Sequence, residues 1–105
     1  MKTSKNKDTL RLTPEQDWHV STVDAEQKAI EKALQSKTSG EVLLDLTQID
    51  QMDSMGLKLL VGLYKTCVKK GLKLRVEASS SKILRLTRLC GLNQYIEIQE
   101  VVAHG

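Results

Sequence analysis

Aromatic residues are scarce in this 105-residue chain: Phe, Tyr and Trp together make up 3% of it, and Phe is absent. Because proteins bind single-stranded nucleic acids by stacking the bases on aromatic side chains, this scarcity argues against such a ligand. It also predicts a core of Leu, Ile, Val, Ala and Met. The net charge of +3 is mild and the lysines are scattered, so a solvated surface is a simpler interpretation than a patch for nucleic acid or an anionic membrane.

Cysteine and long apolar runs are scarce as well. The two cysteines, Cys67 and Cys90, lie within apolar helical patterns, and we expect two reduced core residues, without a disulfide or a metal. No apolar run approaches the roughly 18 residues that cross a bilayer. Residues 1–7 are polar and charged with no apolar segment behind them, unlike a signal peptide. We therefore expect a cytoplasmic protein that does not insert into a membrane.

Strand-like and helix-like patterns alternate along the chain. We expect a flexible tail over residues 1–7 and one domain over residues 8–105. A sequence resembling a capping box, Ser21 and Asp24, precedes the first apolar helical pattern. The order favours an α/β fold with a mostly parallel sheet. Strands are expected over residues 9–13, 42–46, 72–78 and 95–99, and helices over residues 22–35, 54–70 and 82–90.

The second predicted helix is amphipathic and ends at a glycine. Lysines occupy its polar side, and Gly71 follows its last residue, as is common at helix C-termini. The predicted strand that precedes this helix, residues 42–46, is nearly all apolar, which is typical of a central strand covered on both faces. The residues that we expect on the buried side of this helix are Leu57, Leu60, Val61, Tyr64, Cys67 and Val68.

The turn before this helix is the most informative part of the chain. Asp53 is a natural N-cap, because its carboxylate can accept a hydrogen bond from a free amide at the positive end of the helix dipole. Ser54 occupies the first helical position with its hydroxyl toward solvent, so it is the best candidate for covalent modification. Gly56 either permits close approach of a partner or packs closely within the domain.

Catalytic patterns are poorly represented. The chain has no Gly-x-Ser-x-Gly elbow and no glycine-rich phosphate loop ending in Lys-Ser or Lys-Thr. His19 and His104 lie in a polar loop and at the chain end, and the sequence places neither beside the candidate serine. Cys67 and Cys90 lack a metal-binding spacing with a histidine, and Asp45 lacks the other residues of a receiver-type phosphorylation site. We therefore expect a protein that is not an enzyme and that uses no cofactor.

Two segments resemble a known family. Asp45-Leu46-Thr47, then Ile49 and Met52-Asp53-Ser54-Met55-Gly56-Leu57, resembles the signature of STAS domains, named for sulfate transporters and anti-sigma factor antagonists. Residues 83–92 are similar to the third helix of that family and its Gly-Leu ending. The resemblance covers residues 10–98 and implies a STAS-like α/β fold, with four to five strands in a mixed sheet and three to four helices. A terminal fourth helix, common in the antagonists, has little chain left after residue 99.

The resemblance also implies a function. In stand-alone anti-sigma factor antagonists, the serine after this aspartate is phosphorylated by an ATP-dependent kinase that is also the anti-sigma factor. Carried over, Ser54 is phosphorylated, this releases a bound kinase or anti-sigma-type partner, and a cognate phosphatase reverses it. Residues 14–17 are a degraded counterpart of the family's Gly-Glu-Leu-Asp segment, and Met55 replaces a second serine. The expected partner-binding residues are Asp17, Asp53, Ser54, Met55, Gly56 and Lys58.

The physical chemistry of the turn is compatible with this switch. A phosphate would add about −1.5 to −2 charges at a helix N-terminus, where the dipole and free amides favour it and Asp53 opposes it. We therefore expect the fold to survive phosphorylation. A partner docked over Asp53, Ser54 and Gly56 would meet a desolvated dianion instead, at a cost of several kcal/mol.

Two other STAS functions remain open at the level of the sequence. One is a constitutive subunit of a larger assembly, such as an ABC-type lipid transporter, for which a threonine at position 54 would be the more favourable residue. The other is a regulator of biofilm formation or chemotaxis without a sigma-factor target. An enzyme or a ligand-binding protein would require a pocket with convergent polar groups.

Overall fold

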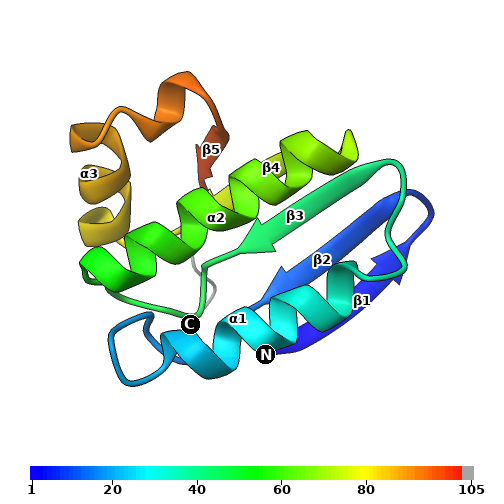
Figure 1. The fold of residues 1–105 in the computed structure, drawn as a ribbon. Coiled ribbons are helices and arrows are strands. Elements are labelled where there is room, and N and C mark those ends of the chain that lie inside the picture. Colours follow the sequence, from blue (N-terminus) through cyan, green and yellow to red (C-terminus); the bar gives the residue numbers. More distant parts are fainter. Residues whose placement is uncertain (103–105) are drawn as a thin grey trace.

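A five-stranded mixed sheet organises the chain in the computed structural model, which describes residues 1–102. The strand order is β1-β2-β3-β4-β5, with β1 antiparallel to β2 and the other pairs parallel (Figure 1). This confirms the expected STAS-like fold. The elements are β1 (Lys2–Asn6), β2 (Thr9–Thr13), α1 (Val23–Leu34), β3 (Glu41–Asp45), α2 (Ser54–Lys70), β4 (Lys73–Ala78), α3 (Ser81–Leu89), the 3₁₀ helix η1 (Leu92–Gln94) and β5 (Glu97–Glu100).

The helices α1 and α2 lie next to each other over one face of the sheet (Figure 1). Strand side chains alternate between the two faces, so the apolar residues of β2 and β4, together with Val42 and Leu44 of β3, point toward these helices. Leu12, Leu44 and Val76 share one row across the sheet and are completely buried. The core therefore lies between the sheet and the helices, and α3 contributes Ile83 and Leu84 to it.

The other face of the sheet carries charges, although the three middle residues of β3 are apolar. Leu43 points to this face and is buried, with Arg11 and Arg75 as its cross-strand neighbours. The long aliphatic stems of arginine can cover an apolar side chain while the guanidinium groups stay wet. The prediction that β3 is central and covered on both faces is therefore confirmed, but side chains of the sheet itself provide the second cover.

The predicted flexible tail is wrong for most of its length. Lys2–Asn6 forms β1, an edge strand that pairs with β2 in the register Lys2↔Thr13 to Asn6↔Thr9. All five side chains of β1 are exposed, so the strand has no apolar alternation that a sequence reading could detect. Backbone pairing holds it in place, and its lysines are typical of an edge strand that must not attract further chains.

Two predictions about buried side chains also need correction. Cys67 is buried as expected, whereas Cys90 is exposed just after α3. Val68 is 59% exposed, whereas Leu63, which was not predicted to be buried, is buried. The buried face of α2 is therefore rotated slightly about the helix axis from the face that the sequence predicts. Both cysteines carry free thiols in the structure, and their reduced state stays a prediction.

Several element boundaries differ from prediction by a few residues. The first helix begins at Val23 after Thr22, and the Ser21–Asp24 pattern does not cap it. The last strand begins only at Glu97, because the amides of Tyr95 and Ile96 bond back to the Leu92 carbonyl of η1. Within residues 1–102 there is no fourth α-helix, and no helix is long and apolar enough to cross a membrane. His104 lies outside the described residues.

Candidate functional site

The first turn of α2 is held by the carboxylate of Asp53. One oxygen accepts hydrogen bonds from the amides of Met55 (2.9 Å) and Gly56 (3.0 Å), so Asp53 is the N-cap that the sequence predicts. The other oxygen accepts a bond from the amide of Val20 at 3.0 Å, in the loop before α1. Asp53 therefore joins two segments far apart in sequence, and both carboxylate oxygens are occupied.

These bonds also fix the charge of Asp53. The hydrogen bond from the Gly56 amide is the largest influence, and together with those from Val20 and Met55 it lowers the pKa of the Asp53 carboxyl below its ordinary value, although desolvation opposes the shift. Hydrogen bonds that favour the charged form of an acid lower its pKa in this way. A negative charge therefore stands at the start of α2 at neutral pH.

Ser54 is exposed at the first position of α2, as the sequence predicts. No side-chain hydrogen bond involves its hydroxyl in the part of the chain that the structure describes. An enzyme or a partner can therefore reach this hydroxyl without opening the fold. Phosphorylation itself is not visible in the structure, and it stays a prediction.

Asp17 holds the loop that precedes α2 through hydrogen bonds to its backbone. Its carboxylate accepts a hydrogen bond from the Asp50 amide at 2.8 Å and a longer one from the Gln51 amide at 3.4 Å. The Asp50 carbonyl accepts a bond from the Ser80 hydroxyl at the start of α3, and Lys82 pairs with the Asp50 carboxylate at 3.3 Å. The loop that leads to Ser54 is thus tied on both sides, and Asp17 holds its shape.

Gly56 is buried, so the packing interpretation of this glycine is the correct one. A Cβ at this position would lie 2.5 Å from the Trp18 carbonyl oxygen and 2.8 Å from the Cβ atoms of Trp18 and Met52. Trp18 is itself completely buried and forms an isolated parallel bridge with Met52. Gly56 lets the loop before α1 lie flat on α2 and is not available as a contact surface for a partner.

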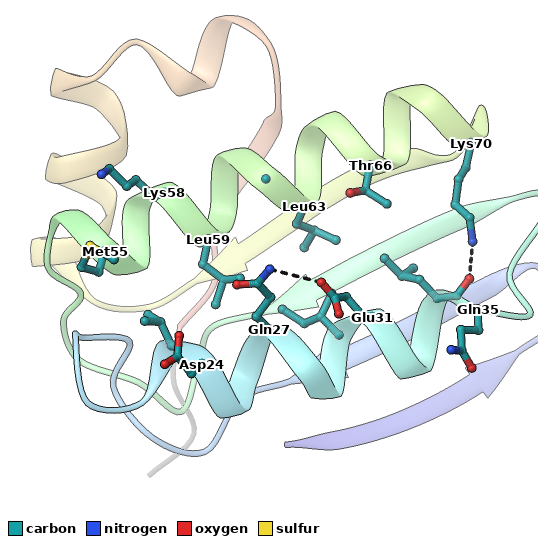
Figure 2. A pocket seen from close by; sticks show the side chains of 14 residues that line it. Asp24, Gln27, Glu31, Gln35, Met55, Lys58, Leu59, Leu63, Thr66 and Lys70 are labelled. Carbon is teal, nitrogen blue, oxygen red and sulfur yellow. Dashed lines mark hydrogen bonds between the residues drawn. The ribbon is translucent and has the colours of Figure 1, made fainter.

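Met55 and Lys58 face outward beside Ser54. Met55 is 37% exposed and Lys58 is exposed. Both line a groove of about 510 Å³ between α1 and α2, which Figure 2 shows from close by. The predicted site residues therefore divide: Ser54, Met55 and Lys58 form an accessible surface, whereas Asp17, Asp53 and Gly56 hold that surface together. Their contact with a partner stays a prediction for all except Gly56, whose burial excludes it.

The sequence reading missed the loop that completes this surface, residues 18–22. Val20 is 69% exposed beside Asp53, and the His19 ring nitrogen lies 2.8 Å from the Ser21 hydroxyl. The Thr22 hydroxyl closes the loop by donating to the Asp17 carbonyl and accepting from the His19 amide. A signal was available in Trp18 and Val20, apolar residues in a polar stretch, but only the fold shows that they meet α2.

Asp45 does not resemble the accessible aspartate of a receiver domain. Desolvation alone would raise the pKa of this buried carboxyl, but hydrogen bonds from the Thr47 hydroxyl (2.6 Å) and amide (2.9 Å) and from Arg11 (2.8 Å) outweigh it, so the pKa is lowered. Its oxygens are committed to these partners. Within residues 1–102, no three His, Cys, Asp or Glu side chains are grouped to hold a metal.

Comparison with known proteins agrees with this fold. The family model of the STAS domain matches residues 1–105. An anti-sigma F factor antagonist from Paenibacillus polymyxa is 30% identical over 91 residues, 87% of this chain and 76% of that protein. An anti-sigma-B factor antagonist from Listeria monocytogenes is 36% identical over 58 residues, 55% of this chain, and the match spans about half (51%) of that relative.

Solved structures give the same result for the fold. A Thermotoga maritima protein described as an anti-sigma factor antagonist superposes with a TM-score of 0.86 at 16% identity, over 96% of this chain and 86% of that one. The anti-sigma factor antagonist SpoIIAA in its unphosphorylated form superposes with a TM-score of 0.68 at 13% identity, over 97% and 88% of the two chains. The sequence matches decide the family, and this chain belongs to the STAS domain family.

Proposed function

We propose that this protein is a non-catalytic partner-switching regulator of the anti-sigma factor antagonist type, controlled by phosphorylation of Ser54. The observation that carries the proposal is the first turn of α2, where an accessible serine stands on a helix start that Asp53 and Gly56 lock in place. Relatives of the chain are named anti-sigma factor antagonists, and the partner that we propose is a serine kinase or anti-sigma-type protein. A cognate phosphatase completes the cycle.

The local geometry explains how a phosphate would act on a partner and not on the fold. Asp53 already occupies the amides of Met55, Gly56 and Val20. A phosphate on Ser54 would compete poorly for them, so it would project into solvent from the rigid turn. Lys58 lies four residues further along the same helix face, an arrangement that favours an acid before a base. The dianion is therefore tolerated by the domain and repels a partner that fits a neutral serine.

The first test is phosphorylation in a lysate of the source cells with ATP, followed by mapping of the phosphate by mass spectrometry. We expect phosphate on Ser54 and its loss in Ser54→Ala. Ser81→Ala is the matched control, because Ser81 is also an exposed serine at the first position of a helix. Labelling that persists in Ser54→Ala, or an unmodified Ser54 while other substrates are labelled, would contradict the switch and favour a constitutive subunit of a larger assembly.

A second test addresses release. Partners captured by the unmodified chain should be lost from a Ser54→Asp chain and kept by Ser54→Asn, which has the same size without the charge. We expect at least a roughly tenfold weaker complex for Ser54→Asp, because a buried unpaired charge costs more than about 1.4 kcal/mol. Equal binding of the two variants would show that charge at this position does not control the partner.

A further inference from the structure

The groove between α1 and α2 has an apolar floor and begins beside the candidate switch. Ile30, Leu34 and Leu63 are buried along its length, and its volume is about 510 Å³. Its near end is lined by Met55, the residue after Ser54. At its far end the Lys70 ammonium donates to the Leu34 carbonyl, which closes the groove (Figure 2). A partner that covers Ser54 would therefore also contact the near end of this groove.

The two sides of the groove carry opposite charges. The α1 side presents Asp24 and Glu31, and the α2 side presents Lys58, whereas the Lys70 ammonium is held at the far end by the Leu34 and Lys37 carbonyls. No cation within residues 1–102 lies within 4.0 Å of either carboxylate, and no carboxylate there lies as close to Lys58. The sides thus hold charges that the chain leaves without ion-pair partners.

A glycine lies in the middle of the groove without a structural reason inside the domain. Gly62 lines the groove and is exposed, and a Cβ added to it would meet no heavy atom within 4 Å. Glycine in a helix interior is destabilising because of its backbone entropy. Here it is not required by packing within the chain, in contrast to Gly56. Because Gly62 has no side chain, the backbone of another helix can approach α2 closely at this position.

We propose that this groove receives an amphipathic helix of a partner protein, with basic residues along the flank that faces α1 and acidic residues along the flank that faces α2. The groove follows α1, whose 12 residues span about 18 Å, the length of three helical turns. Apolar side chains at helical spacing would fill the floor, as in other helix-in-groove complexes. A fatty acid carries one charged end and matches only one of the two sides. This proposal rests on the proposed function in one respect: it takes the partner whose helix binds the groove to be the partner that phosphorylation of Ser54 releases.

The test is a titration of the ¹⁵N-labelled full chain with three synthetic peptides of about 14 residues, stapled on the outer face to keep them helical. All three peptides have the same leucine face and differ only in their flanks. The mixed peptide has one basic and one acidic flank, the second peptide has lysine on both flanks, and the third has glutamate on both. We expect the mixed peptide to shift the amide signals of Leu59, Gly62 and Thr66. We also expect it to bind roughly fivefold more tightly than the others, the equivalent of two exposed ion pairs.

Two variants of α2 locate the binding. Gly62→Trp fills the groove and should abolish the shifts. Lys65→Trp is the matched control, because Lys65 is exposed on α2 and does not line the groove, so binding should be retained. Circular dichroism of both variants verifies that α2 is intact. Should Gly62→Trp unfold the chain, Glu31→Lys replaces it: this change on α1 should remove the preference for the mixed peptide.

Three outcomes would overturn the proposal: no shifts in the groove, shifts elsewhere, or equal affinity for all three peptides. Shifts at Gly62 caused by sodium laurate but by none of the peptides would assign the groove to acyl chains instead. The titration contains no kinase and no phosphate, so its failure leaves the phosphorylation of Ser54 untouched. Conversely, an unmodified Ser54 in the lysate assay leaves the peptide result standing.

Discussion

At the scale of single residues, Asp53 decides more of the site than Ser54 does. Its carboxylate caps α2 with one oxygen and holds the Val20 amide with the other. A serine or threonine cap would satisfy the helix end as well, but its single oxygen would not reach both segments. The identity of this residue therefore couples the shape of the loop before α1 to the start of α2.

Asp53→Asn should lower the melting temperature at pH 7, because the amide group of asparagine presents a donor to the Val20 amide in place of an acceptor. The folded-state pKa of Asp53 lies below its ordinary value of 3.8. The carboxylate therefore stabilises the fold above that value, and the contribution is lost as the pH falls through the folded-state pKa. The difference in melting temperature between wild type and variant should shrink from pH 7 to pH 2. Thermal unfolding across this range measures it, and a constant difference would contradict the argument.

The two glycines on opposite sides of α2 predict opposite effects of the same substitution. Gly56→Ala forces a Cβ to within 2.5 Å of the Trp18 carbonyl oxygen, and such overpacking destabilises a fold by about 1–3 kcal/mol. Gly62→Ala adds a Cβ in open space and should stabilise the fold by about 0.5–1 kcal/mol, the difference in helix propensity. Urea denaturation of both variants measures the contrast, and effects of equal sign would show that the packing around Gly56 is misassigned.

At the scale of elements, the helix ends were the most predictable features. Gly71 and Gly91 both adopt positive φ at the positions where the sequence predicts the ends of helices. Asp53 and Ser80 cap α2 and α3 through hydrogen bonds to nearby amides. These are local interactions within three residues, so a local pattern encodes them. The start of α1 was mispredicted because the Thr22 hydroxyl bonds within the preceding loop and not to the helix.

Ser80 links two elements, and its removal should show this. Its hydroxyl oxygen accepts bonds from the amides of Lys82 (3.2 Å) and Ile83 (3.4 Å), and the hydroxyl donates to the Asp50 carbonyl. Ser80→Ala should destabilise the fold by about 1 kcal/mol through loss of the cap. It should also speed amide hydrogen exchange in residues 50–53. Ser81→Ala is the control, since Ser81 makes no such bonds in the described chain, and equal exchange in both variants would contradict the link.

At the scale of the whole molecule, ion pairs on the charged face of the sheet link side chains of four of the five strands. Arg11 on β2 pairs with Asp45 on β3 at 2.8 Å, and Arg75 on β4 pairs with Glu41 on β3 at 3.0 Å and with Glu97 on β5 at 3.9 Å. The hydrogen bond from Arg75, the largest influence, lowers the pKa of the Glu41 carboxyl. This network lies opposite the helices, so it supports the sheet without contributing to the candidate site.

Arg11→Met should destabilise the protein by about 1–3 kcal/mol, because the buried Asp45 carboxylate loses its charged donor and keeps only its bonds from Thr47. Methionine preserves the apolar cover over Leu43. Lys73→Met is the matched control, since its 3.9 Å pair with Glu97 is exposed on both sides, and such pairs contribute less than about 1 kcal/mol. Chemical denaturation at pH 7 compares them, and an equal effect of both changes would show that the Arg11–Asp45 pair behaves as a surface pair.

What the sequence by itself determined were the features encoded by local patterns. The alternation in β4, the apolar run of β3, the stripe of α2 and its Asp53 cap with Ser54 beside it follow from residues close to one another in the chain. These patterns sufficed to predict an α/β fold with a mostly parallel sheet and the position of the candidate switch, because periodicity and capping depend on near neighbours. The mixed sheet was predicted only from the family resemblance.

Only the tertiary structure decided which distant segments share a surface. The bond from Val20 to Asp53, the burial of Gly56 under Trp18, the pairing of β1 and the groove between α1 and α2 each join residues separated by an intervening part of the chain. A polar strand such as β1, or a glycine such as Gly62, has no local signal that reveals its neighbours. The role of such a residue depends on the residues that it contacts in the folded chain, and these are distant from it in sequence.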